Sequence, residues 1–196
     1  MPHRHFLFHK PYGYLSQFAG EANKKKLGEF HDFPPGIMAI GRLDEDSEGL
    51  LLLTTDGQVS EAVRSKQVEK EYYAQVNGLL DDDALAQLRA GVEIGIHSVR
   101  YRTGPCAARR LDPAPAFAPR SRRIRDDRHG PTSWVSVTLT EGKYRQVRKM
   151  TAAVGCPTLR LVRVRIGSIW LGALAPGSVV EVAGFGLAGL PPHGNV

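Results

Sequence analysis

Four consecutive leucines at positions 50–53 form a compact apolar run in the chain. The run follows a polar, acidic stretch at 41–48 and ends shortly before an Asp-Gly pair at 56–57. A run this short between turn residues is typical of a strand buried on both faces, because a helix would need to be longer. The pattern therefore predicts a buried strand with an acidic loop at its entrance.

The rest of the chain mixes short strand patterns with a few helix patterns. Strands are predicted at 6–10, 37–40, 71–77, 134–140 and 158–166, with a final hairpin over 169–182 that turns at 176–177. Helices are predicted at 23–30, at 58–66 behind an Asp56 cap, from Asp81 to Gly91, and at 144–154. Short antiparallel strands with a few helices indicate an α+β fold. We expect one domain over 1–184 and a flexible tail over 185–196, which is rich in glycine and proline.

Residues 97–130 show neither the two-residue period of a strand nor the three-to-four-residue period of a helix. They carry nine arginines together with several prolines. This composition predicts a ragged hairpin or a long loop. The segment is either a solvated insertion or a clamp for RNA. The density of arginine favours the clamp, because guanidinium groups match the geometry of phosphate. Arg120, Arg122 and Arg123 are the candidate RNA-binding residues in it.

The formal net charge of +6 suggests a polyanionic partner. Cys106 and Cys156 lie far apart, which argues against a zinc site and against a disulfide framework. The N-terminus shows no apolar signal region, and no apolar run approaches the length of a membrane span. We therefore expect a cytoplasmic protein.

Two stretches of the sequence resemble metal-binding patterns only in part. Asp44, Asp46 and Glu48 alternate ahead of a glycine as in a calcium loop, but the twelfth position is Thr55 where that loop needs a glutamate. The histidines at positions 3, 5 and 9 alternate near the N-terminus without a carboxylate close by in sequence. We predict no metal and no cofactor.

The acidic loop presents Arg42 and Asp44 just before the buried strand begins. A buried strand is a rigid support for a reactive side chain at its entrance. The same residues also fit an ordinary surface loop with solvated acids. Their chemistry alone leaves both interpretations open.

Four segments resemble, in the same order, the motifs of RNA pseudouridine synthases in the branch that modifies ribosomal RNA. They are His-Lys-Pro-Tyr-Gly at 9–13, Gly-Arg-Leu-Asp with Ser-Glu-Gly-Leu-Leu at 41–51, Lys-Glu-Tyr at 70–72, and Glu-Gly-Lys-Tyr-Arg-Gln-Val-Arg-Lys-Met at 141–150. The resemblance covers about residues 5 to 182. It implies a mostly antiparallel sheet split into two lobes, with the active-site cleft across the middle.

The resemblance implies three catalytic residues. Asp44 would act on the target uridine, either by covalent addition or by stabilising a detached base. Arg148 would compensate the charge of Asp44 inside the cleft. Tyr72 would stack on the uracil, although its strand pattern alone favours a packed aromatic residue.

The resemblance also implies RNA-binding residues and a substrate. Arg42 would fill the space left by the flipped-out uridine or hold a phosphate, because a base within folded RNA must leave its stack to react. Lys10, Lys70, Arg145 and Lys149 would contact RNA. The implied substrate is one uridine of 23S rRNA in the peptidyl-transferase region.

The family motifs begin at residue 10, so we expect no additional RNA-binding domain ahead of them, and we expect a monomer. Two alternatives remain open. One is a synthase for another rRNA or tRNA uridine. The other is a non-catalytic rRNA-binding or ribosome-assembly factor that retains the fold.

Overall fold

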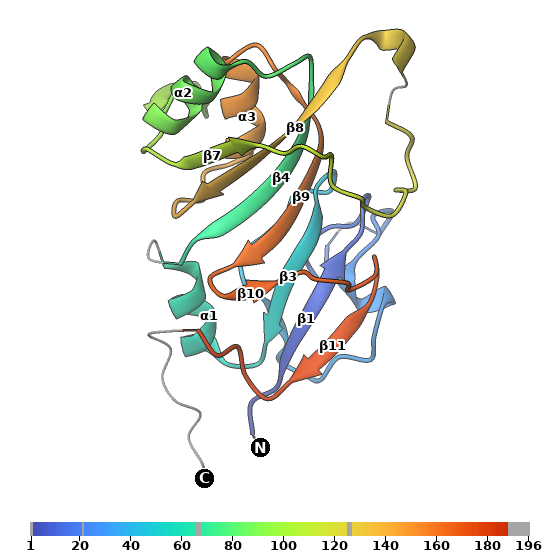
Figure 1. Ribbon diagram of the computed structural model, residues 1–196. Helices are drawn as coiled ribbons and strands as arrows, with labels where there is room; N and C mark the ends of the chain where they lie inside the picture. The colour runs from blue at the N-terminus through green and yellow to red at the C-terminus, as the bar shows by residue number, and fades with distance from the viewer. Residues whose placement is uncertain (1, 21, 66–67, 125–126, 188–196) are drawn as a thin grey trace. The chain divides into compact units, whose positions relative to one another are not determined.

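The structure is a computed structural model that describes residues 2–20, 22–65, 68–124 and 127–187 (Figure 1). The chain divides into two compact units. Unit 1 comprises Met1–Val68 and Arg163–Val196, and unit 2 comprises Glu69–Val162. Unit 1 is therefore discontinuous in sequence, with unit 2 inserted between its two segments.

Unit 1 is built on a sheet whose strands are ordered β11-β1-β3-β9, with β2 paired to β3 and β10 paired to β9. The pairs β1–β11, β1–β3, β2–β3 and β9–β10 are antiparallel. The strands are β1 His5–Lys10, β2 Met38–Ala39, β3 Glu48–Thr54, β9 Thr158–Ile166, β10 Ile169–Trp170 and β11 Val179–Val182. Only the last four residues of β9 belong to this unit.

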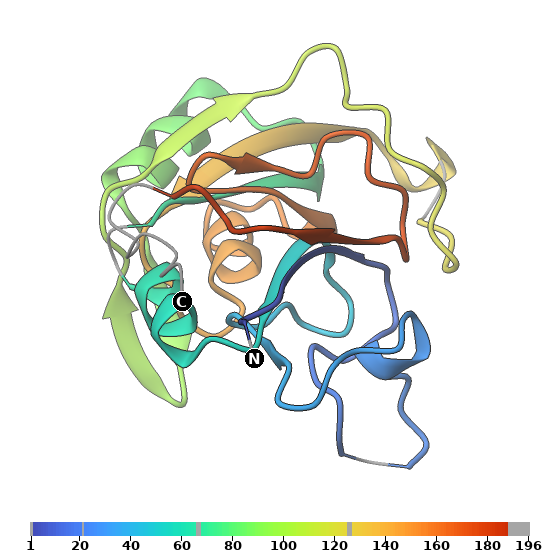
Figure 2. The same ribbon diagram turned by 90° about the horizontal axis from the view of Figure 1, so that it is seen from below.

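The core of unit 1 confirms the interpretation of the leucine run. Every residue of β3 is buried. Phe6, Phe8, Leu51 and Leu53 form a hydrophobic cluster against which side chains from the segment 18–37 pack. Figure 2 shows this segment, in blue, gathered on one side of β1 and β3. Burial on both faces explains why the run shows no alternation.

The helix α1, Gly57–Arg64, begins where the sequence predicts it. The Asp56 carboxylate accepts hydrogen bonds from the backbone N–H groups of Gln58 at 2.8 Å and Val59 at 3.2 Å. These bonds satisfy donors that the first turn of a helix leaves unpaired. Val59 and Val63 are buried, as the three-four spacing indicates.

Unit 2 combines a second part of the sheet with two helices. Its strands are ordered β9-β4-β8-β7, and β5 and β6 form a separate hairpin. Side chains from β4 and β8 and from both helices form one hydrophobic core. The elements are β4 Lys70–Asn77, α2 Asp82–Ala90, β5 Glu93–Ile96, β6 Val99–Arg102, β7 Ala107–Arg110, β8 Thr132–Leu139, α3 Gln146–Ala153 and the first five residues of β9.

The helix predicted at 23–30 is wrong. Only a single 3₁₀ turn forms there, over Leu27–Glu29. The backbone around it bonds to another segment instead, since Leu15 N–H donates to the Lys25 carbonyl and Leu27 N–H donates to the Gln17 carbonyl. Gly28 also weakens a helix in this stretch, because glycine in a helix interior costs about 1 kcal/mol relative to alanine.

The final hairpin predicted at 169–182 is also wrong, because its two strands pair with other partners. Strand β10 pairs with the end of β9, and β11 pairs with β1. Gly177 N–H donates to the His9 carbonyl at 2.8 Å, so the turn at 176–177 directs the chain onto the edge of β1. Turn chemistry predicted the bend but could not predict which strand would be the partner.

The arginine-rich region 97–130 is more regular at its start than predicted. The β5–β6 hairpin turns at His97 and Ser98, both with positive φ, and β7 pairs with β8. Beyond Arg110, the described residues up to Pro131 include one short 3₁₀ turn, Asp127–His129. At the other end of the chain, Phe185 and Leu187 are buried although they fall in the predicted tail, and 188–196 lie outside the described residues.

Candidate active site

Asp44 lies in a loop over residues 41–47 that leads into β3, and this is the Asp44 loop. The chain turns sharply at its start, where Gly41 has a φ of 71°. A second turn brings the Ser47 N–H to the Asp44 carbonyl at 3.0 Å. Leu43 and Ser47 are buried, whereas Asp44 is half-buried. The carboxylate of Asp44 thus stands on a turn whose neighbours are anchored in unit 1.

Hydrogen bonds from the Ser16 side chain and the Gly13 backbone fix the Asp44 loop on both sides of the aspartate. The Ser16 hydroxyl donates to the Leu43 carbonyl at 2.7 Å and accepts from the Leu43 N–H at 2.9 Å. Gly13 N–H donates to the Glu45 carbonyl at 2.8 Å. Sequence reasoning missed Ser16, because a lone serine in a loop carries no periodic or charge signal.

The side chain of Lys10 also anchors the Asp44 loop. Its side chain has no exposed surface. Its ammonium group donates to the carbonyls of Ser47 at 2.7 Å and Pro11 at 3.1 Å. Lys10 was predicted to contact RNA, but this burial argues against that role, because no phosphate can reach the group. Its position supports a structural role in holding the Asp44 loop.

The same burial changes the proton affinity of Lys10. Removal from water disfavours the charged form and lowers the pKa of Lys10 to about 8. The negative charges of Glu48, Asp46, Asp44 and Glu45 oppose this shift without cancelling it.

We expect the stability of the protein to rise with pH between about 8 and 10.4 because of Lys10. In this window the unfolded chain keeps the lysine proton that the folded chain releases, so the free energy of unfolding increases by at most about 1.4 kcal/mol per pH unit. Urea unfolding of the wild type and of Lys10→Met at a series of pH values measures the effect. A constant difference between the two proteins across the window would contradict it.

Strand β3 approaches β9 unusually closely just after the Asp44 loop. Gly49 has a φ of 107°, and a Cβ atom there would lie 2.3 Å from the carbonyl oxygen of Arg163. The Arg163 side chain is buried, and its Nε donates to the Leu50 carbonyl at 2.8 Å. Only glycine fits this backbone position.

Tyr72, Lys70 and Arg148 lie in unit 2. Lys70 and Tyr72 belong to β4 and pair in register with Leu139 and Val137 of β8. Tyr72 is half-buried and packs against the core of the unit. Arg148 is a half-buried residue of α3, as expected for a side chain on the flank of the buried stripe.

Arg145 and Lys149 are the remaining basic candidates at α3. Arg145 precedes the helix in a left-handed conformation, with a φ of 52°. The Lys149 ammonium donates to the Gly95 carbonyl at 2.6 Å and lies 5.0 Å from the centre of the Tyr144 ring. The Lys149 charge therefore lies beside a solvent-exposed aromatic ring.

A hydrogen-bond network around Glu141 holds the start of α3. Its carboxylate accepts from the Tyr101 hydroxyl at 2.6 Å, from the Gly104 N–H at 3.0 Å and from the Gln146 amide at 2.6 Å. Burial raises the pKa of Glu141, but these hydrogen bonds outweigh burial and leave that pKa below its usual value. Sequence reasoning placed Glu141 in a motif without giving it this role.

We expect Glu141→Gln to lower the free energy of unfolding by about 1 to 3 kcal/mol, because an amide replaces an acceptor with a donor that faces other donors. Denaturant unfolding at pH 7 measures this loss. In the wild type, the contribution of Glu141 should be lost as the pH falls through its lowered pKa. Glu93→Gln is the matched control, since its exposed pair with Arg100 at 3.2 Å should contribute less than about 1 kcal/mol. Equal losses in the two variants would contradict the role of the network.

The arginine candidates differ in exposure. Arg42 is exposed, and its guanidinium donates to the Gln17 side chain at 2.6 Å. Arg120 is half-buried and donates to the carbonyls of Arg122 and Leu159. Arg122 and Arg123 are exposed. Arg42, Arg122 and Arg123 are therefore accessible to a large ligand.

The structure brings some candidates together and leaves others as predictions. Unit 1 holds Asp44, Arg42 and Lys10 around one loop, and unit 2 holds the other candidates. The pairing of Asp44 with Arg148 joins residues of different units and stays a prediction. Among the residues that the structure describes, no three histidine, cysteine, aspartate or glutamate residues gather in a way that could hold a metal ion. None of the described helices combines the length and apolar character that a membrane-spanning helix needs.

Comparison with known protein families tests the resemblance of the four motifs. The sequence profile of the family described as RNA pseudouridylate synthase matches residues 4–153. The chain belongs to this family. The resemblance of its motifs is thereby confirmed, and the chain is an RNA pseudouridine synthase, an isomerase.

Two curated relatives and one solved structure extend this result. The chain is 48% identical over 175 residues to ribosomal large subunit pseudouridine synthase E of Xanthomonas axonopodis pv. citri, covering 87% of this chain and 89% of the relative. It is 40% identical over 178 residues to the protein of the same name from Vibrio parahaemolyticus, covering 90% of this chain and 72% of the relative.

A crystal structure of a pseudouridylate synthase superposes with a TM-score of 0.73 at 26% identity, covering 93% of this chain and 71% of that one. This likeness confirms the predicted α+β, mostly antiparallel pseudouridine synthase fold.

Proposed function

We propose that this pseudouridine synthase converts one uridine of 23S rRNA, in the peptidyl-transferase region of the large ribosomal subunit, to pseudouridine. The identity of 48% along most of the length of both chains with a large-subunit pseudouridine synthase carries this proposal. The net charge of +6 supports an RNA substrate. A cytoplasmic monomer that acts on the rRNA or on an assembly intermediate is part of the proposal.

Asp44 would carry the chemistry. The reaction breaks the bond between uracil N1 and ribose C1′ and forms a bond between C5 and C1′, while C5 loses a proton and N1 gains one. The Asp44 carboxylate would either add covalently to the nucleotide or stabilise the detached base and accept the C5 proton. Its loop is fixed through Ser16, Gly13 and Lys10, which supports such a role because the carboxylate needs little reorganisation before it reacts.

Two residues of unit 2 would complete the site. The guanidinium of Arg148 would stabilise the charge of Asp44 once the RNA has closed the cleft, where an uncompensated carboxylate would be costly. The ring of Tyr72 would stack on the uracil. Both side chains are half-buried, so part of each remains accessible to the RNA.

The RNA would be held by accessible cations. The target uridine must leave its stack at a cost of a few kcal/mol. Arg42, on the Asp44 loop, would occupy the vacated space or bind the adjacent phosphate. Exposed Arg122 and Arg123 would bind the RNA backbone further away.

Mapping of pseudouridines across all rRNA and tRNA, in cells with and without the gene, tests the proposal. We expect loss at a single 23S position. Loss confined to tRNA or to another rRNA would remove the large-subunit assignment. An unchanged map together with defective ribosome assembly would indicate a non-catalytic assembly factor.

A further inference from the structure

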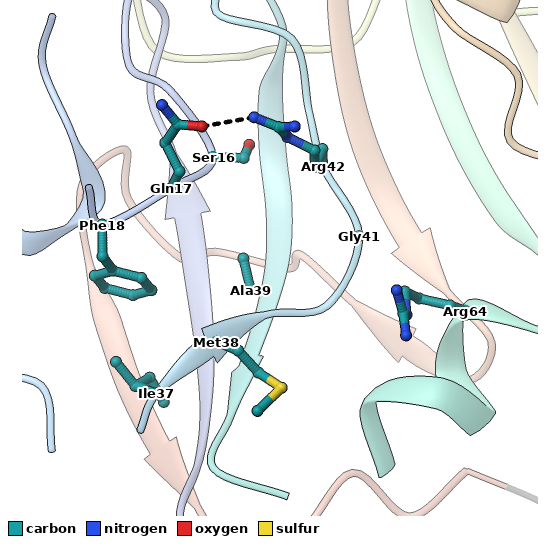
Figure 3. Close-up of a pocket in the computed structure, with 9 residues that line it drawn as sticks. All are labelled: Ser16, Gln17, Phe18, Ile37, Met38, Ala39, Gly41, Arg42 and Arg64. Atoms are coloured by element: carbon teal, nitrogen blue, oxygen red, sulfur yellow. Dashed lines mark hydrogen bonds between the residues drawn. The ribbon is translucent and has the colours of Figure 1, made fainter. Parts of the chain in front are cut away.

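A pocket of about 420 Å³ opens in unit 1 beside the Asp44 loop (Figure 3). Its volume lies within the range of small-ligand sites. One side is apolar, with Phe18, Ile37 and Met38, and the other side carries two arginines, Arg42 and Arg64. In Figure 3 the Arg64 side chain extends from α1 toward the space beside Gly41 and Met38. Of the pocket residues, only Arg42 has a role in the proposed function, and Arg64 has none.

The charges of the two arginines are not neutralised within the described part of the chain. Arg42 donates to the neutral Gln17 side chain, and Arg64 Nε donates to the Ser60 carbonyl at 3.2 Å. Neither guanidinium forms an ion pair with a carboxylate of the described residues. Two uncompensated guanidinium groups at one pocket favour an anionic occupant, and they match phosphate in geometry.

The apolar side of the pocket favours a ligand that also carries a flat, poorly hydrated group. Phe18 is held by an edge contact with Phe33, at 5.2 Å between ring centres, so its ring is a fixed surface. Met38 is 37% exposed, which is high for a large apolar side chain at a strand position. A nucleotide combines a planar base with a phosphate, whereas an inorganic anion would leave the apolar side unused.

The pocket and the Asp44 loop share residues. Gly41 and Arg42 line the pocket and begin the loop, and Ser16 of the pocket wall bonds both backbone groups of Leu43, the residue before Asp44. A group bound in the pocket would therefore lie next to the nucleotide on which Asp44 would act. The neighbouring nucleotide of the same RNA strand is the group that this arrangement would meet.

We propose that this pocket binds a nucleotide next to the isomerised uridine, with its base against Phe18, Ile37 and Met38 and its phosphate on Arg42 and Arg64. The proposal rests on the proposed function and adds a second nucleotide subsite to it. Arg64 is then an RNA-binding residue contributed by a helix outside the family motifs quoted above.

Binding of a 23S rRNA fragment to the full chain at several salt concentrations tests Arg64 directly. We expect Arg64→Gln to weaken binding about fivefold and to reduce the slope of log affinity against log salt by about 0.7, the value for one phosphate on single-stranded RNA. Arg89→Gln is the matched control, because Arg89 also lies in the last turn of a helix and donates through Nε to a backbone carbonyl, that of Ala108. Unchanged affinity and slope in Arg64→Gln would overturn the proposal.

Removal of single bases from the RNA tests the apolar side. We expect one abasic position next to the target uridine to weaken binding to the wild type, and the same position to cost nothing further in Met38→Ala combined with Arg64→Gln. If every abasic position weakens both proteins equally, the pocket does not hold a base. A wild type that binds the RNA but forms no pseudouridine would refute the proposed function, while the binding data would still decide the subsite.

Discussion

Asp44→Asn should abolish pseudouridine formation, with a loss of at least about 10⁴-fold in the single-turnover rate, and should leave RNA affinity nearly unchanged. An amide has the shape of the carboxylate but neither its charge nor its nucleophilicity. The bonds that fix the loop backbone run through Ser16, Gly13 and Lys10, so the turn should keep its conformation. A radiolabelled RNA fragment and nearest-neighbour analysis of the product measure the rate.

Asp46→Asn is the matched control for this variant. It removes the same charge two residues further along the same turn, where the proposed mechanism needs no carboxylate. The control should retain most of the activity of the wild type. A rate near that of the wild type in Asp44→Asn, or an equal loss in both variants, would show that Asp44 does not carry the chemistry.

Gly49→Ala should destabilise the protein by about 4 kcal/mol or more, which makes it the largest expected effect on folding. The new Cβ would lie 2.3 Å from the Arg163 carbonyl oxygen and 2.6 Å from the Arg163 nitrogen. Both are backbone atoms of a paired strand and cannot move aside as a flexible side chain can. The φ of 107° adds further strain for any residue with a Cβ.

Thermal and denaturant unfolding measure the effect, and Gly57→Ala is the control. Gly57 begins α1, and a Cβ there would meet nothing within 4 Å. Its replacement by alanine should be neutral or stabilising by up to about 1 kcal/mol. If Gly49→Ala unfolds at the same denaturant concentration as the wild type, the close approach of β3 and β9 is not as described.

Several elements could be predicted from local pattern alone. The leucine run at 50–53 has no polar side to place in water, so a strand covered on both faces was the favoured solution. Asp56 followed by a three-four apolar spacing indicated both the start of α1 and its buried face. The same spacing indicated α3 and left Arg148 on the flank of its buried stripe. In each case the signal lay within one helix or one strand.

Other features depend on contacts between distant segments, and the sequence could not indicate them. Lysines 24–26 were expected on a helix, yet the backbone of Lys25 and Leu27 bonds to residues 15 and 17. The turn at 176–177 was recognised, but β11 pairs with β1 rather than with β10. Lys10 was expected to contact RNA because its motif resembles that of the family, and only the fold shows that its buried ammonium group donates to the backbone carbonyls of Pro11, Glu45 and Ser47. The contacts that anchor the Asp44 loop therefore could not be predicted from the sequence.

The discontinuity of unit 1 has a consequence for how the enzyme matures on the ribosome that makes it. Strand β1 pairs with β11, whose residues are translated about 170 positions after it. At about 5 to 20 residues per second, the nascent chain waits for roughly ten to thirty seconds with this edge uncovered. The inserted unit 2 is continuous and can fold during that delay. Unit 1 should thus be complete only after β11 has been translated, and the waiting β1 edge is a natural place for a chaperone to bind.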